Sequence, residues 1–258
     1  MALAFERLGS GQPLVLLHGV GHRRQAWYPV LDRLTPHREV VLVDLPGHGE
    51  SPPLQQGDGP VDAMLAGVVG LLDDLGLQRP HIAGNSLGGR LALEAGVAGH
   101  AATVTALSPA GFWRSKAEAG YAYAVFKIME TVGRRLMPVA PRMSRSPLGR
   151  SLMYSTIVSK PARMTPEQAE GDMAAFVSAA DALNAVLAGM TTFTGHLPPD
   201  VPVTIAWGTR DRMLPQRQML RAKASLPDAR LVRLPGCGHV PMTDNPALVA
   251  DVLLSGSS

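Results

Sequence analysis

The sequence predicts an α/β fold, in which helices cover both faces of a mostly parallel β-sheet. Three features predict it: short apolar runs rich in β-branched residues, helical segments between these runs, and glycine-rich turns where several runs end. Near-continuous apolar runs are typical of strands that are buried on both faces, as in a parallel sheet. In such folds the ligand site lies at the carboxyl ends of the strands.

Six apolar runs are predicted to be the strands of this sheet. Their ranges are 13–19, 39–47, 80–86, 103–111, 201–209 and 229–236. Apolar residues at helical spacing predict helices at 27–34 and at 64–75, and Gly76 is placed to end the second helix. Asn245 and Pro246 predict the start of a last helix, because asparagine favours the capping position and proline the first turn.

The alternation of strands and helices is interrupted between residues 112 and 196. An interval of about 85 residues is too long for a structureless loop in a compact domain, and its residue pattern predicts helices. One of them begins at a capping box formed by Thr165, Pro166 and Gln168. We therefore expect a core formed by residues 1–111 and 197–258, with residues 112–196 inserted as a helical lid (cap).

The composition is that of a globular protein, with 46% hydrophobic residues, 17% charged residues and a net charge of +3. Because the arginines are scattered along the sequence, we expect no nucleic-acid partner. No apolar stretch approaches the roughly 20 residues of a membrane span, and the N-terminal segment lacks the apolar region of a secretory signal. The single cysteine, Cys237, allows no internal disulfide and favours a cytoplasmic location. The oligomeric state is left open.

The sequence GNSLGG at 84–89 places Ser86 between glycines, directly after a predicted strand and before a helical segment. A G-x-S-x-G pattern alone is a weak signal, because roughly one comparable glycine-rich sequence in six contains it by chance. At a strand-to-helix turn, however, small neighbours let strand and helix approach closely while the hydroxyl is lifted above the sheet edge. Ser86 is therefore the candidate nucleophile.

A serine hydroxyl needs a base to remove its proton and a carboxylate to orient that base. Of the eight histidines, His239 follows the last predicted strand and so lies at the same sheet edge as Ser86. Asp211 follows the preceding strand, although an aspartate in that place can also serve only to cap the next helix. Asp44 is a competing carboxylate in a loop, whereas Asp244 is too close in sequence to His239 to face it.

Two backbone amides are candidates for an oxyanion hole. Val20 follows the first buried strand in the sequence LLHGVGH, and Leu87 follows the candidate nucleophile. Two donors aimed at the developing negative charge lower the barrier to acyl transfer by several kcal/mol. This set of groups requires no cofactor and no metal, and the sequence shows no cluster of histidine, cysteine and carboxylate residues at metal-ligand spacing.

These motifs resemble the landmarks of the α/β-hydrolase superfamily, in the branch that has a serine nucleophile and a helical lid. The resemblance covers nearly the whole chain and is carried by PLVLLHGVG, VVLVDLPGHGES, IAGNSLGGRLALE, IAWGTRDRMLP and LPGCGHVPMTDNP. It implies a sheet of eight strands, or of seven if the family's first strand is missing, with the lid after the sixth strand. It also implies that Ser86, Asp211 and His239 are nucleophile, acid and base, with the amides of Val20 and Leu87 as oxyanion donors.

The serine at position 86 argues against the epoxide hydrolases and haloalkane dehalogenases of this superfamily, which use an aspartate there. The GNS elbow is similar to that of the meta-cleavage-product C–C hydrolases. Those enzymes commonly follow their histidine with tryptophan, however, where this chain has Val240. The resemblance to that branch is therefore partial.

We expect a carboxylesterase-like serine hydrolase that cleaves an ester of a small to medium hydrophobic molecule through an acyl-enzyme. The lid carries most of the aromatic residues of the chain. Most of them are expected to pack the lid against the core, and Trp113 is the candidate wall of an apolar pocket. Hydrolysis of a C–C bond, a lactone or an amide by the same three residues is the alternative. A ligand-binding receptor that keeps the fold for its pocket is a third, weaker interpretation.

Overall fold

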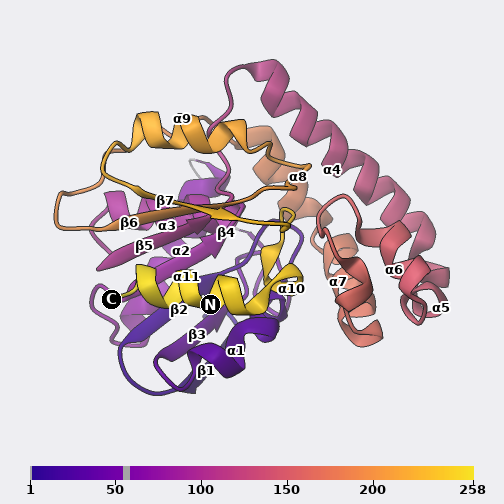
Figure 1. Cartoon of the computed structure of the whole chain (residues 1–258), viewed down its shortest axis with the longest axis horizontal. Coiled ribbons are helices and arrows are strands. Elements are labelled where there is room, and N and C mark those ends of the chain that lie inside the picture. The colour runs from indigo at the N-terminus through magenta and orange to yellow at the C-terminus, as the bar shows by residue number, and fades with distance from the viewer. Residues whose placement is uncertain (1, 55–58) are drawn as a thin grey trace.

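The computed structural model describes residues 2–54 and 59–258 and contains a seven-stranded sheet in the order β1-β3-β2-β4-β5-β6-β7 (Figure 1). β1 pairs antiparallel with β3, and every other neighbouring pair is parallel. The strands are β1 (Phe5–Gly9), β2 (Pro13–Leu17), β3 (Glu39–Val43), β4 (His81–Asn85), β5 (Thr103–Leu107), β6 (Val203–Gly208) and β7 (Arg230–Leu234). The mostly parallel sheet is confirmed, and of the two strand counts that the sequence allowed, seven is observed.

The central strands and the edge strands differ in burial. Every residue of β4 and β5 is buried, and β2 and β3 are buried beyond their first residue. The edge strand β1 is largely exposed, β7 is partly exposed, and both carry charged side chains. In β1, Arg7 is hydrogen-bonded to Glu39 of β3 at 2.9 Å. Charges on an edge strand discourage pairing with another chain, so the sheet ends where its sequence becomes polar.

Helices cover both faces of the sheet. α11 packs with η1 and α1 on one face, and α2 packs with α3 on the other, so Figure 1 shows α11 in front of the strands and α3 behind them. The helices outside the long insertion are η1 (Arg24–Val30), α1 (Leu31–Leu34), α2 (Pro60–Asp74), α3 (Leu87–Val97), α9 (Arg217–Ser225), α10 (Pro241–Asp244) and α11 (Pro246–Gly256). The helix predicted at 27–34 is 3₁₀ over its first part, where Pro29 cannot donate a backbone hydrogen bond.

Capping contacts confirm the predicted helix ends. Asn245 accepts a hydrogen bond from the N–H of Leu248 at 3.3 Å, at the start of α11. Thr165 accepts one from the N–H of Gln168 at 3.1 Å. Gly76 follows α2 with a φ of 66°, a left-handed conformation that glycine adopts without steric cost.

Residues 112–196, called the helical insertion below, connect β5 to β6 and cover the sheet edge at which Ser86 lies (Figure 1). The elements of the insertion are α4 (Lys116–Leu136), η2 (Met137–Val139), α5 (Ala140–Ser144), α6 (Pro147–Tyr154), η3 (Pro161–Arg163), α7 (Pro166–Ser178) and α8 (Ala180–Gly189). The resemblance implied an insertion after the sixth strand. It follows the fifth strand here, because no strand precedes β1 in the described residues.

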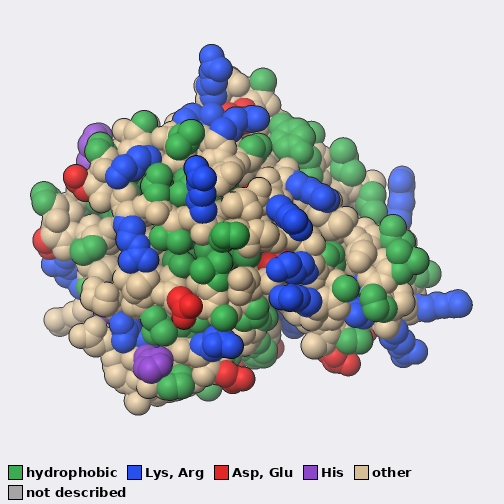
Figure 2. All heavy atoms as spheres, in the orientation of Figure 1, with side chains coloured by type: hydrophobic (Ala, Val, Ile, Leu, Met, Phe, Trp, Pro, Cys, Tyr) green, Lys and Arg blue, Asp and Glu red, His purple; other side chains and the backbone are tan. Residues whose placement is uncertain are grey.

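In residues 2–54 and 59–258, no single helix is both long and apolar enough to cross a bilayer, and the pair α7 and α8, which together reach that length and apolarity, is bent by 63°. Figure 2 shows one face of the molecule, on which lysine and arginine side chains spread over both the core and the insertion. Hydrophobic side chains lie between them. This spread agrees with the scattered arginines of the sequence.

Candidate active site

Ser86 lies in a sharp turn between β4 and α3. Its φ of 55° and ψ of −113° belong to a region that residues other than glycine seldom adopt. Backbone hydrogen bonds hold the turn: the N–H of Ser86 donates to the carbonyl of Leu107, and its carbonyl accepts from the N–H groups of Arg90 and Ala110. A strained turn of this kind presents the side chain above the sheet edge.

The glycines around Ser86 are required by the close approach of α3 to the sheet. A Cβ at Gly84 would collide with the carbonyl of Gly88, and a Cβ at Gly88 would collide with the carbonyl of Leu17. A Cβ at Gly19 would lie 3.3 Å from the Cβ of Ser86, so the loop after β2 passes directly beside the serine. The glycines thus bring β2, β4 and α3 together around one hydroxyl group.

His239 and Asp211 are hydrogen-bonded to each other at the same sheet edge. His239 follows β7 and Asp211 follows β6, and Nδ1 of the imidazole is 2.8 Å from Oδ2 of the carboxylate. Oδ1 of Asp211 accepts hydrogen bonds from the N–H groups of Met213 at 2.9 Å and Leu214 at 2.8 Å. Asp211 therefore stabilises the turn before α9 and orients His239 at the same time.

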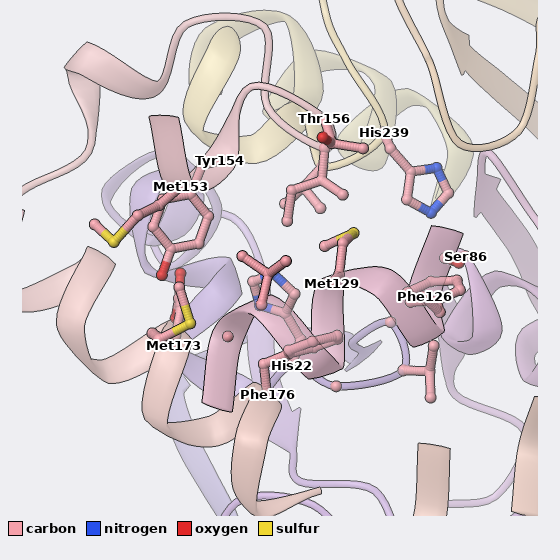
Figure 3. A pocket seen from close by; sticks show the side chains of 18 of the residues that line it. His22, Ser86, Phe126, Met129, Met153, Tyr154, Thr156, Met173, Phe176 and His239 are labelled. Atoms are coloured by element: carbon pink, nitrogen blue, oxygen red, sulfur yellow. The ribbon is translucent and has the colours of Figure 1, made fainter. Parts of the chain in front are cut away.

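The other imidazole nitrogen of His239 faces Ser86. Nε2 is buried and has no hydrogen-bond partner within the described residues, and Figure 3 shows the ring pointing toward Ser86. No hydrogen bond between Ser86 and His239 is found within the described residues. In ligand-free enzymes such contacts are often long and shorten when substrate binds, so the geometry suits a proton transfer between these two groups.

Two backbone N–H groups beside Ser86 are free to bind an anion. Across residues 2–54 and 59–258, no hydrogen-bond acceptor is found for the N–H of Val20 or of Leu87. Both residues line a small cavity together with Ser86. Leu87 is also the first residue of α3, where the helix dipole favours negative charge. Two such N–H groups beside a hydroxyl can stabilise a developing negative charge.

Two cavities meet at Ser86. The larger one, of about 190 Å³, contains Ser86 and His239 and is walled by apolar residues of the insertion, among them Phe126, Met129, Met153, Met173 and Phe176 (Figure 3). The smaller one, of about 50 Å³, lies on the side of Leu87 and contains Trp113. The structure therefore brings Trp113 near the serine, but in the smaller of the two cavities.

Two residues that position His239 were missed by the sequence analysis. The side-chain amide of Asn85 donates hydrogen bonds to the carbonyl of His239 at 2.9 Å and to that of Leu107 at 3.1 Å. Asp244, which the sequence analysis rejected as a partner of the imidazole, accepts a hydrogen bond from the N–H of Gly238 at 2.7 Å. The sequence offered one signal for each residue. Asn85 is a polar residue inside an apolar strand, and Asp244 directly precedes the capping residue of α11.

His22 and Asp172 were also missed, and both line the larger cavity. Burial lowers the pKa of His22 and raises the pKa of Asp172, because removal from water disfavours the charged forms. Each of these side chains has buried polar atoms without a hydrogen-bond partner within the described residues. An aspartate next to methionine and alanines in the sequence of α7 was the only signal of this pair.

The remaining candidates have structural surroundings. Nε2 of His18 accepts a hydrogen bond from the N–H of Leu45, and burial holds the pKa of His18 well below its usual range. Asp44 is ion-paired with Arg24 inside the loop after β3. Burial raises the pKa of the Cys237 thiol to about 11, which makes it a poor nucleophile. In the described part of the chain, no group of three metal-binding side chains is found.

Comparison with known proteins supports this architecture. A Pseudomonas putida protein named 2-hydroxy-6-oxononadienedioate/2-hydroxy-6-oxononatrienedioate hydrolase 2 is 28% identical over 93% of this chain and 85% of its own length. A solved structure of a membrane phospholipase A, described as a bacterial virulence factor, has a TM-score of 0.75 at 24% identity and covers 99% of this chain and 83% of its own.

The 2-hydroxy-6-oxo-6-phenylhexa-2,4-dienoate hydrolase of Rhodococcus sp. strain RHA1 has a TM-score of 0.73 at 22% identity, with 98% of each chain covered. These two solved structures share the fold with this chain. Residues 14–252 match the family described as the alpha/beta hydrolase family. Because this match runs from β2 into α11 and includes both loops that carry His239 and Asp211, the chain belongs to the alpha/beta hydrolase family.

Proposed function

We propose that this protein hydrolyses esters of small to medium hydrophobic molecules through an acyl-enzyme, with Ser86 as nucleophile, His239 as base and Asp211 as the orienting acid. The observation that carries the proposal is the convergence of these groups at one sheet edge. His239 is bound to Asp211 through Nδ1, which leaves Nε2 unpaired and turned toward Ser86. This is the arrangement that a serine needs to become nucleophilic.

In the first half-reaction, Nε2 of His239 takes the proton of Ser86 while Oγ bonds to the ester carbonyl carbon. The carbonyl oxygen becomes an oxyanion and accepts hydrogen bonds from the amides of Val20 and Leu87. The C–O bond to the alcohol then breaks, and the protonated imidazole gives its proton to the leaving oxygen. Asp211 remains ionised and stabilises the imidazolium.

In the second half-reaction, water replaces the alcohol. His239 takes a proton from the water, whose oxygen attacks the acyl carbon, and the same two amides hold the oxyanion. The bond to Oγ of Ser86 then breaks, Ser86 regains its proton from His239, and the acid leaves. None of these steps needs a metal or a cofactor.

The two cavities favour a hydrophobic acyl group and a small alcohol. The larger cavity is mostly apolar and is lined by residues of the insertion, whereas the smaller one has Trp113 in its apolar lining. Apolar walls with few polar groups bind hydrophobic ligands by excluding water. Trp113 accordingly limits the size of the alcohol, and the residues of α4 and α7 contact the acyl chain.

Covalent labelling and a substrate panel test the proposal. A fluorophosphonate should label Ser86 stoichiometrically, chromogenic acyl esters should be hydrolysed, and Ser86→Ala should lower kcat by roughly 10⁶-fold. Ser108→Ala is the matched control, because Ser108 is also a buried serine with a positive φ at the end of a strand but lines neither cavity. Absence of both labelling and turnover in the folded protein would refute the proposal.

Hydrolysis of a C–C bond is the second candidate, favoured by the named activities of two similar proteins. The same three residues would then act on a vinylogous diketone. Dicarboxylate substrates fit this chain poorly, because the larger cavity has an aspartate and no lysine or arginine in its described lining. This candidate is supported if the protein hydrolyses a diketone faster than any ester and if Ser86→Ala abolishes that activity. Panels of amides and lactones test the remaining bond types in the same way.

A ligand-binding receptor is the third candidate. It predicts thermal stabilisation by apolar ligands without turnover of any ester or diketone.

A cytoplasmic location is the expectation from the single buried cysteine, and localisation of a tagged full-length chain tests it.

A further inference from the structure

The larger cavity contains a buried polar pair that hydrolysis at Ser86 does not use. Asp172 of α7 is only 3% exposed, and neither of its carboxylate oxygens has a hydrogen-bond partner within the described residues. His22, in the loop after β2, has a buried Nδ1 that lacks a partner as well. In the view of Figure 3, His22 lies between Met129 and Tyr154, and all three residues line the same cavity as Ser86. A buried polar atom without a partner is costly, so this pair calls for a ligand atom.

The neighbouring groups do not satisfy the pair. Nε of Arg23 lies 3.7 Å from Oδ1 of Asp172, which offsets its charge but exceeds the length of a hydrogen bond. Gly171 leaves room for this guanidinium, because a Cβ there would collide with it. The hydroxyl of Tyr154 donates to the carbonyl of Ala169 and is already engaged. Arg23 therefore offsets the charge of Asp172, whereas both carboxylate oxygens and Nδ1 of His22 remain without a hydrogen-bond partner within the described residues.

Charge and hydrogen-bonding capacity select one class of ligand group. An anion would be repelled by the Asp172 carboxylate, and a cation would compete with Arg23 for it. His22 is buried with a lowered pKa, so its ring is neutral and offers one donor and one acceptor. A hydroxyl group both donates and accepts, and it therefore suits the carboxylate and either tautomer of the imidazole.

We propose that His22 and Asp172 form a subsite for a hydroxyl group carried on the acyl chain of the substrate, which makes this protein selective for hydroxyacyl esters. The inference rests on the proposed function, because it takes the larger cavity as the acyl pocket. The hydroxyl belongs partway along the chain, since His22 lies between Ser86 and Tyr154 in the view of Figure 3 and all three residues line the cavity. Plain alkyl esters fill the same cavity but leave the pair unsatisfied.

Matched chromogenic esters test the subsite. The two esters of a matched set have the same acyl chain and differ only in whether it carries a hydroxyl group. In successive sets, the hydroxyl group is placed on successive carbons of the acyl chain. For the protein itself, we expect kcat/KM to favour the hydroxylated ester by at least about tenfold at one position. Asp172→Leu should reduce this ratio to about one, Asp172→Asn should preserve part of it, and Met173→Leu, which alters the neighbouring wall without changing hydrogen bonding, should leave the ratio in place.

A binding experiment separates this inference from the proposed function. Ketones with the same chains, with and without the hydroxyl, are titrated into Ser86→Ala by calorimetry, which needs no turnover. A preference for the hydroxyketone that Asp172→Leu removes supports the subsite even if no ester is cleaved. Equal binding of both ketones, or a preference that survives Asp172→Leu, overturns it, and the pair is then satisfied by a buried water.

Discussion

At the scale of single residues, the candidate site depends on side chains with two functions each. Asp211 binds His239 through one oxygen and two backbone N–H groups through the other. Ser86 is a hydroxyl donor and also the residue whose strained backbone turns the chain from β4 into α3. Such a conformation costs about 1–3 kcal/mol and persists because the surrounding structure over-determines it. Local stability and reactivity are therefore coupled at these positions.

Asp211→Asn is expected to separate the two functions of that carboxylate. An amide oxygen can still accept from the N–H groups of Met213 and Leu214, so the thermal midpoint should change little. The amide cannot stabilise an imidazolium at His239, and kcat for ester hydrolysis should fall by about 10⁴-fold. Kinetics and thermal unfolding of the same preparation check both statements. A loss smaller than tenfold would mean that Asp211 does not support the base.

His48 is expected to make the fold sensitive to acid. Burial lowers its pKa from 6.5 to about 4 in the folded state, so the unfolded chain binds the proton more tightly. His48 therefore contributes stability that is complete above pH 6.5 and is lost as the pH falls through that value toward about 4. The loss is on the order of 3 kcal/mol.

Urea unfolding at a series of pH values measures this effect. His48→Gln should show a smaller decrease in the free energy of unfolding between pH 7 and pH 4 than the unmodified protein (roughly 3 kcal/mol less). His37→Gln, at an exposed histidine, serves as the control and should follow the unmodified protein. Parallel curves for His48→Gln and the control would contradict the assignment.

At the scale of elements, the site depends on how closely α3 approaches β4 and β2. The backbone carbonyl groups of Leu17 and Gly88 lie where side chains would have to fit. Helix packing against a sheet normally leaves room for side chains, and glycine removes this requirement. The hydroxyl of Ser86, the loop at Gly19 and the first turn of α3 can meet only because this distance is short.

Gly84→Ala and Gly70→Ala are expected to have opposite effects on stability. At Gly84 the added methyl group collides with the backbone of α3, which should lower the free energy of unfolding by about 3 kcal/mol or more and reduce ester hydrolysis. At Gly70, an exposed position inside α2, the methyl group meets nothing within 4 Å, and stability should rise by about 0.5–1 kcal/mol. Thermal and urea unfolding measure whether each substitution lowers or raises the free energy of unfolding.

At the scale of the whole molecule, the insertion and the core are joined at the loop that carries His239. Asp244 accepts hydrogen bonds from the N–H groups of Ser159 at 3.0 Å and Lys160 at 2.6 Å in the insertion, as well as from Gly238 in the core. The N–H of Val240 donates to the carbonyl of Ile157. The wall of the larger cavity and the candidate base therefore share the buried carboxylate of Asp244 as their anchor.

Asp244→Ala is expected to destabilise residues 157–160 of the insertion and residues 237–240 of the core together. Three backbone N–H groups lose their acceptor, which should cost roughly 3 kcal/mol of stability. Hydrogen exchange should become faster at residues 157–160 and at 237–240 in parallel, and kcat should fall because His239 is no longer held. Asp251→Ala, at an exposed aspartate of α11, is the control. Faster exchange in only one of the two segments would show that Asp244 does not couple them.

The six apolar strands, the capped helices and the family resemblance were all predictable, because each depends on residues that are neighbours in the chain. β1 was outside the six predicted strands, since FERLG is an edge strand with charges and no continuous apolar run. Residues 27–34 were predicted as a helix, but the pattern could not show that the helix is 3₁₀ as far as Val30.

The sequence by itself determined which side chains follow the strands at the carboxyl edge, because strand, turn and helix signals are local and parallel strands align their ends. Only the tertiary structure decided that Trp113 lies in the smaller cavity, that His22 and Asp172 share the larger one, and that Asp244 anchors the loop of His239 to the insertion. These contacts join residues that are far apart in the chain. Their distances are set by how the insertion packs on the core, which no periodicity of the sequence records.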